Sequence, residues 1–157
     1  MTDADRLNDI QSATNPFLAV EQHMGDIIGH KLFTLMVIDR ETNEAARAYS
    51  SNPKEYPVKG RKPLGALSEW GEQVLTRGLP YVGYTAKDIR SVFFDHEVIA
   101  RLGCASVLNV PVISDRTVIG TINLLHEENW YKPDHAERAA PFAALLVPSF
   151  LDWAKRA

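Results

Sequence analysis

The sequence predicts an α+β fold with a central antiparallel β-sheet, terminal helices on one face and a helix and loop lid on the other. Two hairpin patterns predict the sheet: residues 32–39 with 44–50, and residues 106–113 with 117–125. Amphipathic helical patterns stand at both ends of the chain. A chain of 157 residues with 45% hydrophobic side chains can bury one core of its own without a metal or a disulfide.

Two helices are expected before the first hairpin. Thr2 or Asp3 can cap a short polar helix that runs to about Ser12. Asn15 followed by Pro16 is a cap and first-turn signal for a second helix that stops near residue 29. We therefore divide the chain into an N-terminal helical extension, residues 1–14, and a single domain, residues 15–157.

The segment between the two hairpins is expected to form the lid. Residues 51–65 contain three prolines and two glycines, which predicts a loop with at most one short extended piece. Residues 67–76 predict a modest helix, residues 80–82 a short strand, and residues 88–102 two helical pieces with a break near Asp95. Asp88 and Asp95 are expected to cap these pieces.

The second hairpin is expected at the centre of the sheet, because both of its strands are apolar on both faces. Pro111 removes one ladder donor, so a local kink is expected there. The last helical pattern covers residues 134–155 and contains Pro141 and Pro148. A proline inside a helix costs about 3 kcal/mol, so we expect this helix to be kinked or broken at one of them.

The hairpin resembles the strand pair near the end of GAF domains, small sensory modules related in shape to PAS domains. The resemblance rests on a Leu-Gly-x-x-Ser run, a Val-Pro-Val strand and an Ile-Gly-Thr-Ile-Asn-Leu-Leu strand. It implies a GAF/PAS-like fold over nearly the whole chain, from about Asn15 onward. The matching residues are Leu102, Gly103, Ser106, Val110, Pro111, Val112, Ile119, Gly120, Thr121, Ile122, Asn123, Leu124 and Leu125.

Charge and hydropathy exclude several classes of function. The net charge is -3 and there is no basic cluster, which argues against a nucleic-acid partner. No run of eighteen apolar residues occurs, and the first ten residues lack the basic and apolar regions of a signal peptide. We therefore expect a cytoplasmic protein without membrane contact. The single Cys104 cannot form an intrachain disulfide.

Two kinds of side chain are candidates for catalysis. Cys104 could act as a nucleophile if a base lowered its pKa, but its place just before a strand favours a buried structural thiol. His96 and His126 have carboxylates beside them in the sequence, yet their spacing matches no metal-binding signature. Solvated or capping histidines are the alternative, and no metal and no cofactor are expected.

Polar side chains inside the central hairpin are the best candidates for ligand binding. Asn109, Thr121 and Asn123 stand among Val, Ile and Leu, and a buried amide without partners costs about 1 to 3 kcal/mol. These groups either bond to one another and to a nearby loop, or face a pocket under the lid. The residues expected to contribute to such a site are Trp70, Tyr84, Phe93, Phe94, His96, Asn109, Asn123 and His126.

Two functions remain open. The first is a small-molecule-binding sensory or regulatory GAF-like domain, acting as a stand-alone homodimer that pairs through its terminal helices. The second is a small GAF-fold enzyme, reductase-like, that uses Cys104 or a histidine. The resemblance argues against two classes of ligand, cyclic nucleotides and attached chromophores. The sequence pattern of GAF domains that bind the first, and the cysteine of those that attach the second, are both missing. An unknown small organic ligand is the expectation.

Overall fold

The computed structural model describes residues 1–156, and a six-stranded sheet with the order β3-β2-β1-β6-β5-β4 lies at its centre. Every neighbouring pair is antiparallel. The predicted central hairpin, β5 and β6, is interior to the sheet, as its two-sided apolar pattern requires. The strands are β1 (Leu32–Asp39), β2 (Glu44–Ser50), β3 (Lys62–Pro63), β4 (Tyr81–Gly83), β5 (Ser106–Ser114) and β6 (Thr117–His126).

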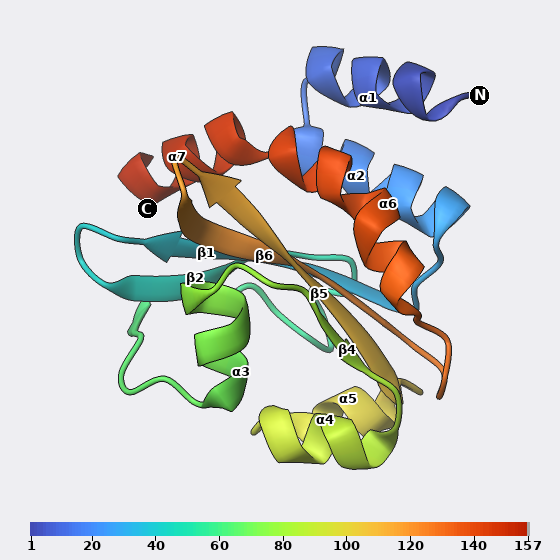
Figure 1. Cartoon of the computed structure of the whole chain (residues 1–157), viewed down its shortest axis with the longest axis vertical. Coiled ribbons are helices and arrows are strands. Elements are labelled where there is room, and N and C mark those ends of the chain that lie inside the picture. Colours follow the sequence, from blue (N-terminus) through green and yellow to red (C-terminus); the bar gives the residue numbers. More distant parts are fainter. Residues whose placement is uncertain (157) are drawn as a thin grey trace.

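The helices lie in two groups on opposite faces of the sheet (Figure 1). The terminal group is α1 (Asp3–Ser12), α2 (Pro16–Ile27), α6 (Pro133–Ala144) and α7 (Val147–Arg156). The lid group is α3 (Glu69–Gly71) with η1 (Glu72–Thr76), α4 (Ala86–Val92) and α5 (His96–Arg101). This arrangement confirms the predicted layers. Residues 67–76, expected as one ordinary helix, begin later and widen into a π-helical turn.

Local capping chemistry explains where several helices begin. The side chains of Thr2, Asn15 and Thr85 each accept a hydrogen bond from a backbone N–H in the first turn of α1, α2 and α4, respectively. The break predicted in the last helix occurs between α6 and α7, and it places Pro148 in the first turn of α7, where a proline costs little. Pro141 remains inside α6.

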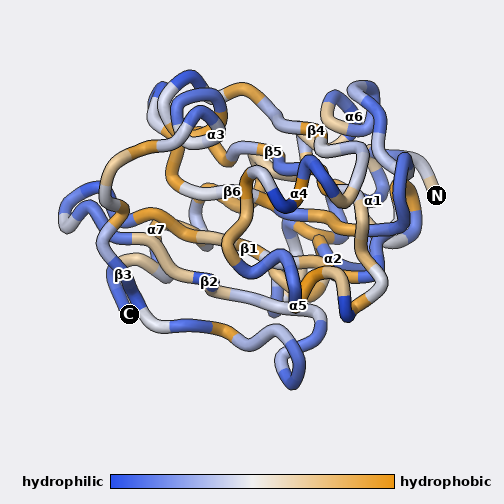
Figure 2. Tube along the Cα trace, turned by 90° about the horizontal axis from the view of Figure 1, so that it is seen from below, coloured by the Kyte–Doolittle hydropathy of each residue, from blue (hydrophilic) through white to orange (hydrophobic). Residues whose placement is uncertain are grey.

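Alternation along the strands separates two apolar layers. Leu108 and Val110 of β5 and Ile122 of β6 pack with the terminal helices, whereas Val107 and Leu125 face the lid. Figure 2 shows the apolar strand segments inside and hydrophilic segments at many of the outer turns. No helix in residues 1–156 is long and apolar enough to cross a membrane.

Gly120 allows α7 to pack directly on the sheet. A Cβ atom at this position would lie 2.2 Å from the Met36 carbonyl oxygen and 2.4 Å from the Phe150 ring. Phe150 is fully buried in the layer beneath the terminal helices. The close approach of β1, β6 and α7 therefore requires glycine here. Near the predicted kink at Pro111, the β5–β6 register shifts between Val112 and Ile113.

Candidate functional site

A row of polar side chains crosses three strands on the lid face of the sheet. In the register of the sheet, Asn123 of β6 lies opposite Thr34 of β1 on one side and opposite Asn109 of β5 on the other. Asn109 Nδ2 donates to Asn123 Oδ1 at 2.7 Å, and Asn123 Nδ2 donates to Thr34 Oγ1 at 3.1 Å. Thr121 Oγ1 also donates to Asn123 Oδ1, at 2.9 Å. We call Thr34, Asn109, Thr121 and Asn123 the polar row.

Trp70 sets the direction of every hydrogen bond in the polar row. Its indole nitrogen is a donor only, and it donates to Asn109 Oδ1 at 3.0 Å. The amide nitrogen of Asn109 must therefore point to Asn123, whose own nitrogen then points to Thr34. An apolar residue at either asparagine would leave buried partners unpaired, which costs about 1 to 3 kcal/mol per group.

The polar row retains two hydrogens that its internal bonds do not use. In the hydrogen bonds formed within residues 1–156, the Asn109 amide uses one of its two hydrogens and the Thr34 hydroxyl acts only as an acceptor. Both side chains are buried, at 1% and 5% exposure. A ligand that offers an acceptor oxygen could satisfy these hydrogens.

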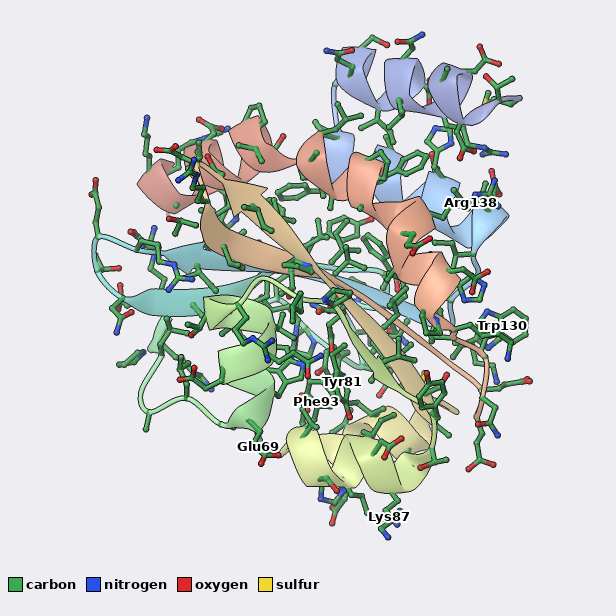
Figure 3. The ribbon with its side chains drawn as sticks, viewed as in Figure 1. Glu69, Tyr81, Lys87, Phe93, Trp130 and Arg138 are labelled. Carbon is green, nitrogen blue, oxygen red and sulfur yellow. The ribbon has the colours of Figure 1, made fainter. Side chains whose placement is uncertain are left out.

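The polar row forms part of the wall of a cavity of about 330 Å³ between the sheet and the lid. This volume lies at the lower end of the range for small-molecule pockets. Figure 3 shows Phe93 and Tyr81 close together between the sheet and helices α4 and α5. The cavity is lined by Thr34, Met36, Ala45, Ala46, Arg47, Tyr56, Lys59, Gly60, Lys62, Pro63, Leu64, Trp70, Val92, Phe93, Phe94, Asp95, Ile99, Val107, Asn109, Thr121, Asn123 and Leu125.

A second polar group, Arg47, Tyr56 and Asp95, stands on another wall of the cavity. Asp95 Oδ2 accepts from the Tyr56 hydroxyl at 2.5 Å and from Arg47 Nη2 at 3.3 Å. The Arg47 guanidinium also lies 3.6 Å from the centre of the Tyr56 ring. Burial, together with the hydrogen bond to Asp95, raises the pKa of Tyr56, so this phenol remains a donor at neutral pH.

The loop that closes one side of the cavity is attached to the rest of the molecule by Arg61. Its guanidinium donates to Asp39 at the end of β1, at 2.5 Å, and to the Ala154 carbonyl of α7. The hydrogen bond from Arg61 lowers the pKa of the Asp39 carboxyl. Because Lys59, Gly60 and Lys62 of the same loop line the cavity, Arg61 fixes the position of the cavity rim.

The structure brings five of the eight predicted site residues together. Trp70, Phe93, Phe94, Asn109 and Asn123 line the cavity. Tyr84, His96 and His126 lie outside its lining. Tyr84 is exposed, and its carbonyl accepts from the Asn129 N–H.

His126 lies in a separate environment beyond the cavity. Its ring stacks on Trp130 with 3.7 Å between the ring centroids, and Figure 3 places Trp130 away from the cavity, on the loop after β6. Its Nδ1 accepts from the Glu127 N–H at 2.7 Å. Burial lowers the pKa of His126, against the opposing charge of Glu127, and the charge of Lys31 lowers it further. Its stacking on Trp130 and its hydrogen bond from the Glu127 N–H give this histidine a structural role outside the cavity.

Cys104 also lies outside the cavity lining. Its side chain is buried in the apolar cluster of the lid face, and its one hydrogen bond within residues 1–156 goes to the Leu102 carbonyl at 3.9 Å. Burial raises the pKa of the thiol to about 11. At neutral pH the sulfur is therefore protonated and a poor nucleophile. Across residues 1–156, no group of three or more His, Cys, Asp or Glu side chains is placed to hold a metal ion.

The cavity contains functional candidates that the sequence did not single out. Arg47, Tyr56, Lys59 and Lys62 come from β2 and the 51–65 loop, which seemed to be a plain connector. Their signal was weak: Arg47 is the one charge in a short run of alanines, residues 45–48. The expected caps are confirmed only in part. Asp95 occupies the N-cap position of α5 but its side chain makes no cap hydrogen bond, and Asp88 belongs to the capping box of α4 as the partner of the N-cap residue Thr85.

Comparison with solved structures identifies the fold. The GAF domain of a phosphoenolpyruvate-protein phosphotransferase from Coxiella burnetii superposes with a TM-score of 0.73 at 16% identity, covering 97% of this chain and 91% of that one. The corresponding GAF domain from Acinetobacter gives 0.70 at 15%, covering 100% and 98%. A free methionine-R-sulfoxide reductase from Neisseria meningitidis, in complex with its substrate, gives 0.67 at 14%, covering 98% and 89%.

Comparison of sequences identifies no relative of this chain. No protein-family model and no curated protein matches the chain. The GAF domains among the structural neighbours nevertheless superpose over nearly the whole length of this chain. Since their identity to this chain is 16% or less, they establish the architecture and leave function to the site itself. The chain has the GAF-domain fold.

Proposed function

We propose that this protein is a small-molecule-binding regulatory domain whose ligand occupies the cavity between the sheet and the lid. The observation that carries this proposal is the polar row, which opens into the cavity with two unused hydrogens on buried side chains. Apolar walls from Phe93, Ile99 and Leu125 surround it. An apolar cavity with a few convergent polar groups is the usual form of a small-molecule site.

The proposal is tested by thermal unfolding of the protein against a metabolite library of neutral, cationic and anionic compounds. A ligand at about one hundred times its dissociation constant adds roughly 2.7 kcal/mol to the free energy of unfolding. We expect Asn109→Leu and Asn123→Leu to remain folded but to lose the ligand-induced stabilisation. Val110→Ala is the matched control, because it weakens the opposite face of β5 and leaves the cavity lining intact.

Two outcomes would overturn the proposal. One is equal ligand-induced stabilisation in the wild type and both asparagine variants, which would remove the polar row from the site. The other is the absence of any binder in the library, which would favour a domain that serves only in assembly. Loss of stabilisation in Val110→Ala as well would show that the readout follows stability and not the cavity.

A reductase-like enzyme is the second function considered for this fold. Its support is that free methionine-R-sulfoxide reductases from Neisseria meningitidis and Thermoplasma acidophilum are among the structural neighbours. In this chain, however, the sulfur of Cys104 is buried, protonated at neutral pH and outside the cavity lining. Ligand binding is therefore the better-supported function.

We also propose that two copies pair through the terminal helices. Leu18 of α2 and Leu151 of α7 are exposed, at 39% and 42%. Near them, the start of α2 and the end of α7 enclose an open hollow lined by Phe17, Trp153 and polar neighbours. Exposed apolar side chains on two helices that share a hollow favour burial against a second surface, and a symmetric copy offers the same surface.

A further inference from the structure

The charge distribution around the cavity points to a chemical class of ligand. Four charged side chains line it: Arg47, Lys59, Lys62 and Asp95. Arg47 and Asp95 form an ion pair at 3.3 Å, with side chains 14% and 12% exposed, so their charges offset one another. Within residues 1–156, neither Lys59 nor Lys62 forms an ion pair. Two unmatched positive charges therefore remain in the lining.

These two lysines stand at the cavity mouth and not at its floor. Lys62 is exposed in the edge strand β3, and Lys59 is half-buried with its ammonium 5.6 Å from the centre of the exposed Phe94 ring. The floor has the opposite character, because Asn109 and Thr121 there are neutral and almost fully buried. An anionic group at the floor would lose its hydration without gaining a counter-ion. At the mouth, the same group stays hydrated and has the two lysines as counter-ions.

On the basis of the proposed function, we propose that the ligand is a small organic carboxylate whose anionic end lies between Lys59 and Lys62. Its apolar body rests against Trp70 and Phe93, and a neutral oxygen at its far end accepts from the unused Asn109 hydrogen. A phosphate is disfavoured because the cavity's arginine, the side chain best suited to grip it, is already bonded to Asp95 and to the Pro57 carbonyl.

Two matched pairs of probes separate charge from shape. They are 4-acetylbenzoate with 4-acetylbenzamide, and 4-hydroxyphenylacetate with 4-hydroxyphenylacetamide. Each pair keeps the ring and the far oxygen and differs in the carboxylate. We expect the carboxylates to bind at least about tenfold more tightly by calorimetry, a difference that shrinks with added salt.

The variant Lys59→Met/Lys62→Met is expected to remove the carboxylate preference and leave the affinity for the amides unchanged. Its matched control is Lys87→Met, because Lys87 is exposed on α4 and outside the cavity lining. Four results would each overturn the carboxylate class. They are equal affinity for acid and amide, a carboxylate preference that survives the double variant, no binding by any probe, and tighter binding of phenyl phosphate than of the carboxylates. The proposed function is tested separately. If an uncharged library compound binds and its binding requires Asn109, the proposed function stands even where the carboxylate class fails.

Discussion

At the scale of single residues, the polar row shows how structural and functional demands are met by the same groups. The sequence left two alternatives for Asn109 and Asn123, and the structure combines them. The two amides hydrogen-bond to one another, and both also line the cavity. The sequence signalled them because amides are rare between Val, Ile and Leu. The sequence signalled Arg47 only weakly and Tyr56 not at all, since their roles depend on where the 51–65 loop returns to the sheet.

Cys104 gives a prediction that depends on pH. Because burial raises the pKa of its thiol to about 11, the reactive thiolate is scarce at pH 7 and becomes abundant only as the pH approaches that value. We expect iodoacetamide to label the native protein far more slowly than the urea-unfolded protein at pH 7, and the native rate to rise through pH 9 to 10. The labelled residue is identified by mass spectrometry.

Cys104→Ala is the matched variant for this measurement. It should remain folded, lose all labelling and keep any ligand binding found for the wild type, since the thiol lies outside the cavity lining. Fast labelling of the native protein at pH 7, or loss of ligand binding in Cys104→Ala, would favour the enzyme reading of this fold.

At the scale of elements, strand and helix patterns were predictable because local chemistry decided them. The hairpin strands β1 and β2 begin and end at the predicted residues, and Pro148 marks the break between α6 and α7. The lid was less predictable. Residues 72–76 form a π-helical turn, which is wider than an ordinary α-helix. This turn packs on β5 and β6, and the local sequence does not encode those contacts.

Gly120 offers the sharpest test of packing between elements. Gly120→Ala places a methyl group 2.2 Å from a backbone oxygen and 2.4 Å from the Phe150 ring, so β6 and α7 must separate. We expect a loss of about 3 kcal/mol in the free energy of unfolding, measured by chemical denaturation. Gly60→Ala is the control, because no atom lies within 4 Å of its added methyl group. A neutral Gly120→Ala would contradict the described contact between α7 and the sheet.

At the scale of the whole molecule, the two faces of the sheet have different roles. The terminal helices cover a continuous apolar core, whereas the lid face holds two smaller clusters with the cavity beside them. The sequence predicted this division through the placement of its helical patterns. It could not predict the cavity, because a void depends on how completely the lid fills the space above the polar row.

The proposed dimer belongs to this scale. We expect light scattering after size exclusion to give twice the monomer mass at micromolar concentration. Leu18→Glu/Leu151→Glu should give a monomer that keeps its fold, since both side chains are already exposed. A wild-type monomer under these conditions, or a double variant that stays dimeric, would contradict pairing through the terminal helices.

The central claim is that a ligand occupies the cavity at the polar row, and the indole N–H signals of the three tryptophans test it most directly. Trp70 donates to Asn109 in the cavity, whereas Trp130 donates to the Ile28 carbonyl outside it. In an NMR titration with a binder from the library, we expect the Trp70 signal, assigned with Trp70→Phe, to shift while that of Trp130 stays in place. A bound ligand that shifts the Trp130 signal and leaves the Trp70 signal in place would contradict ligand binding at the polar row.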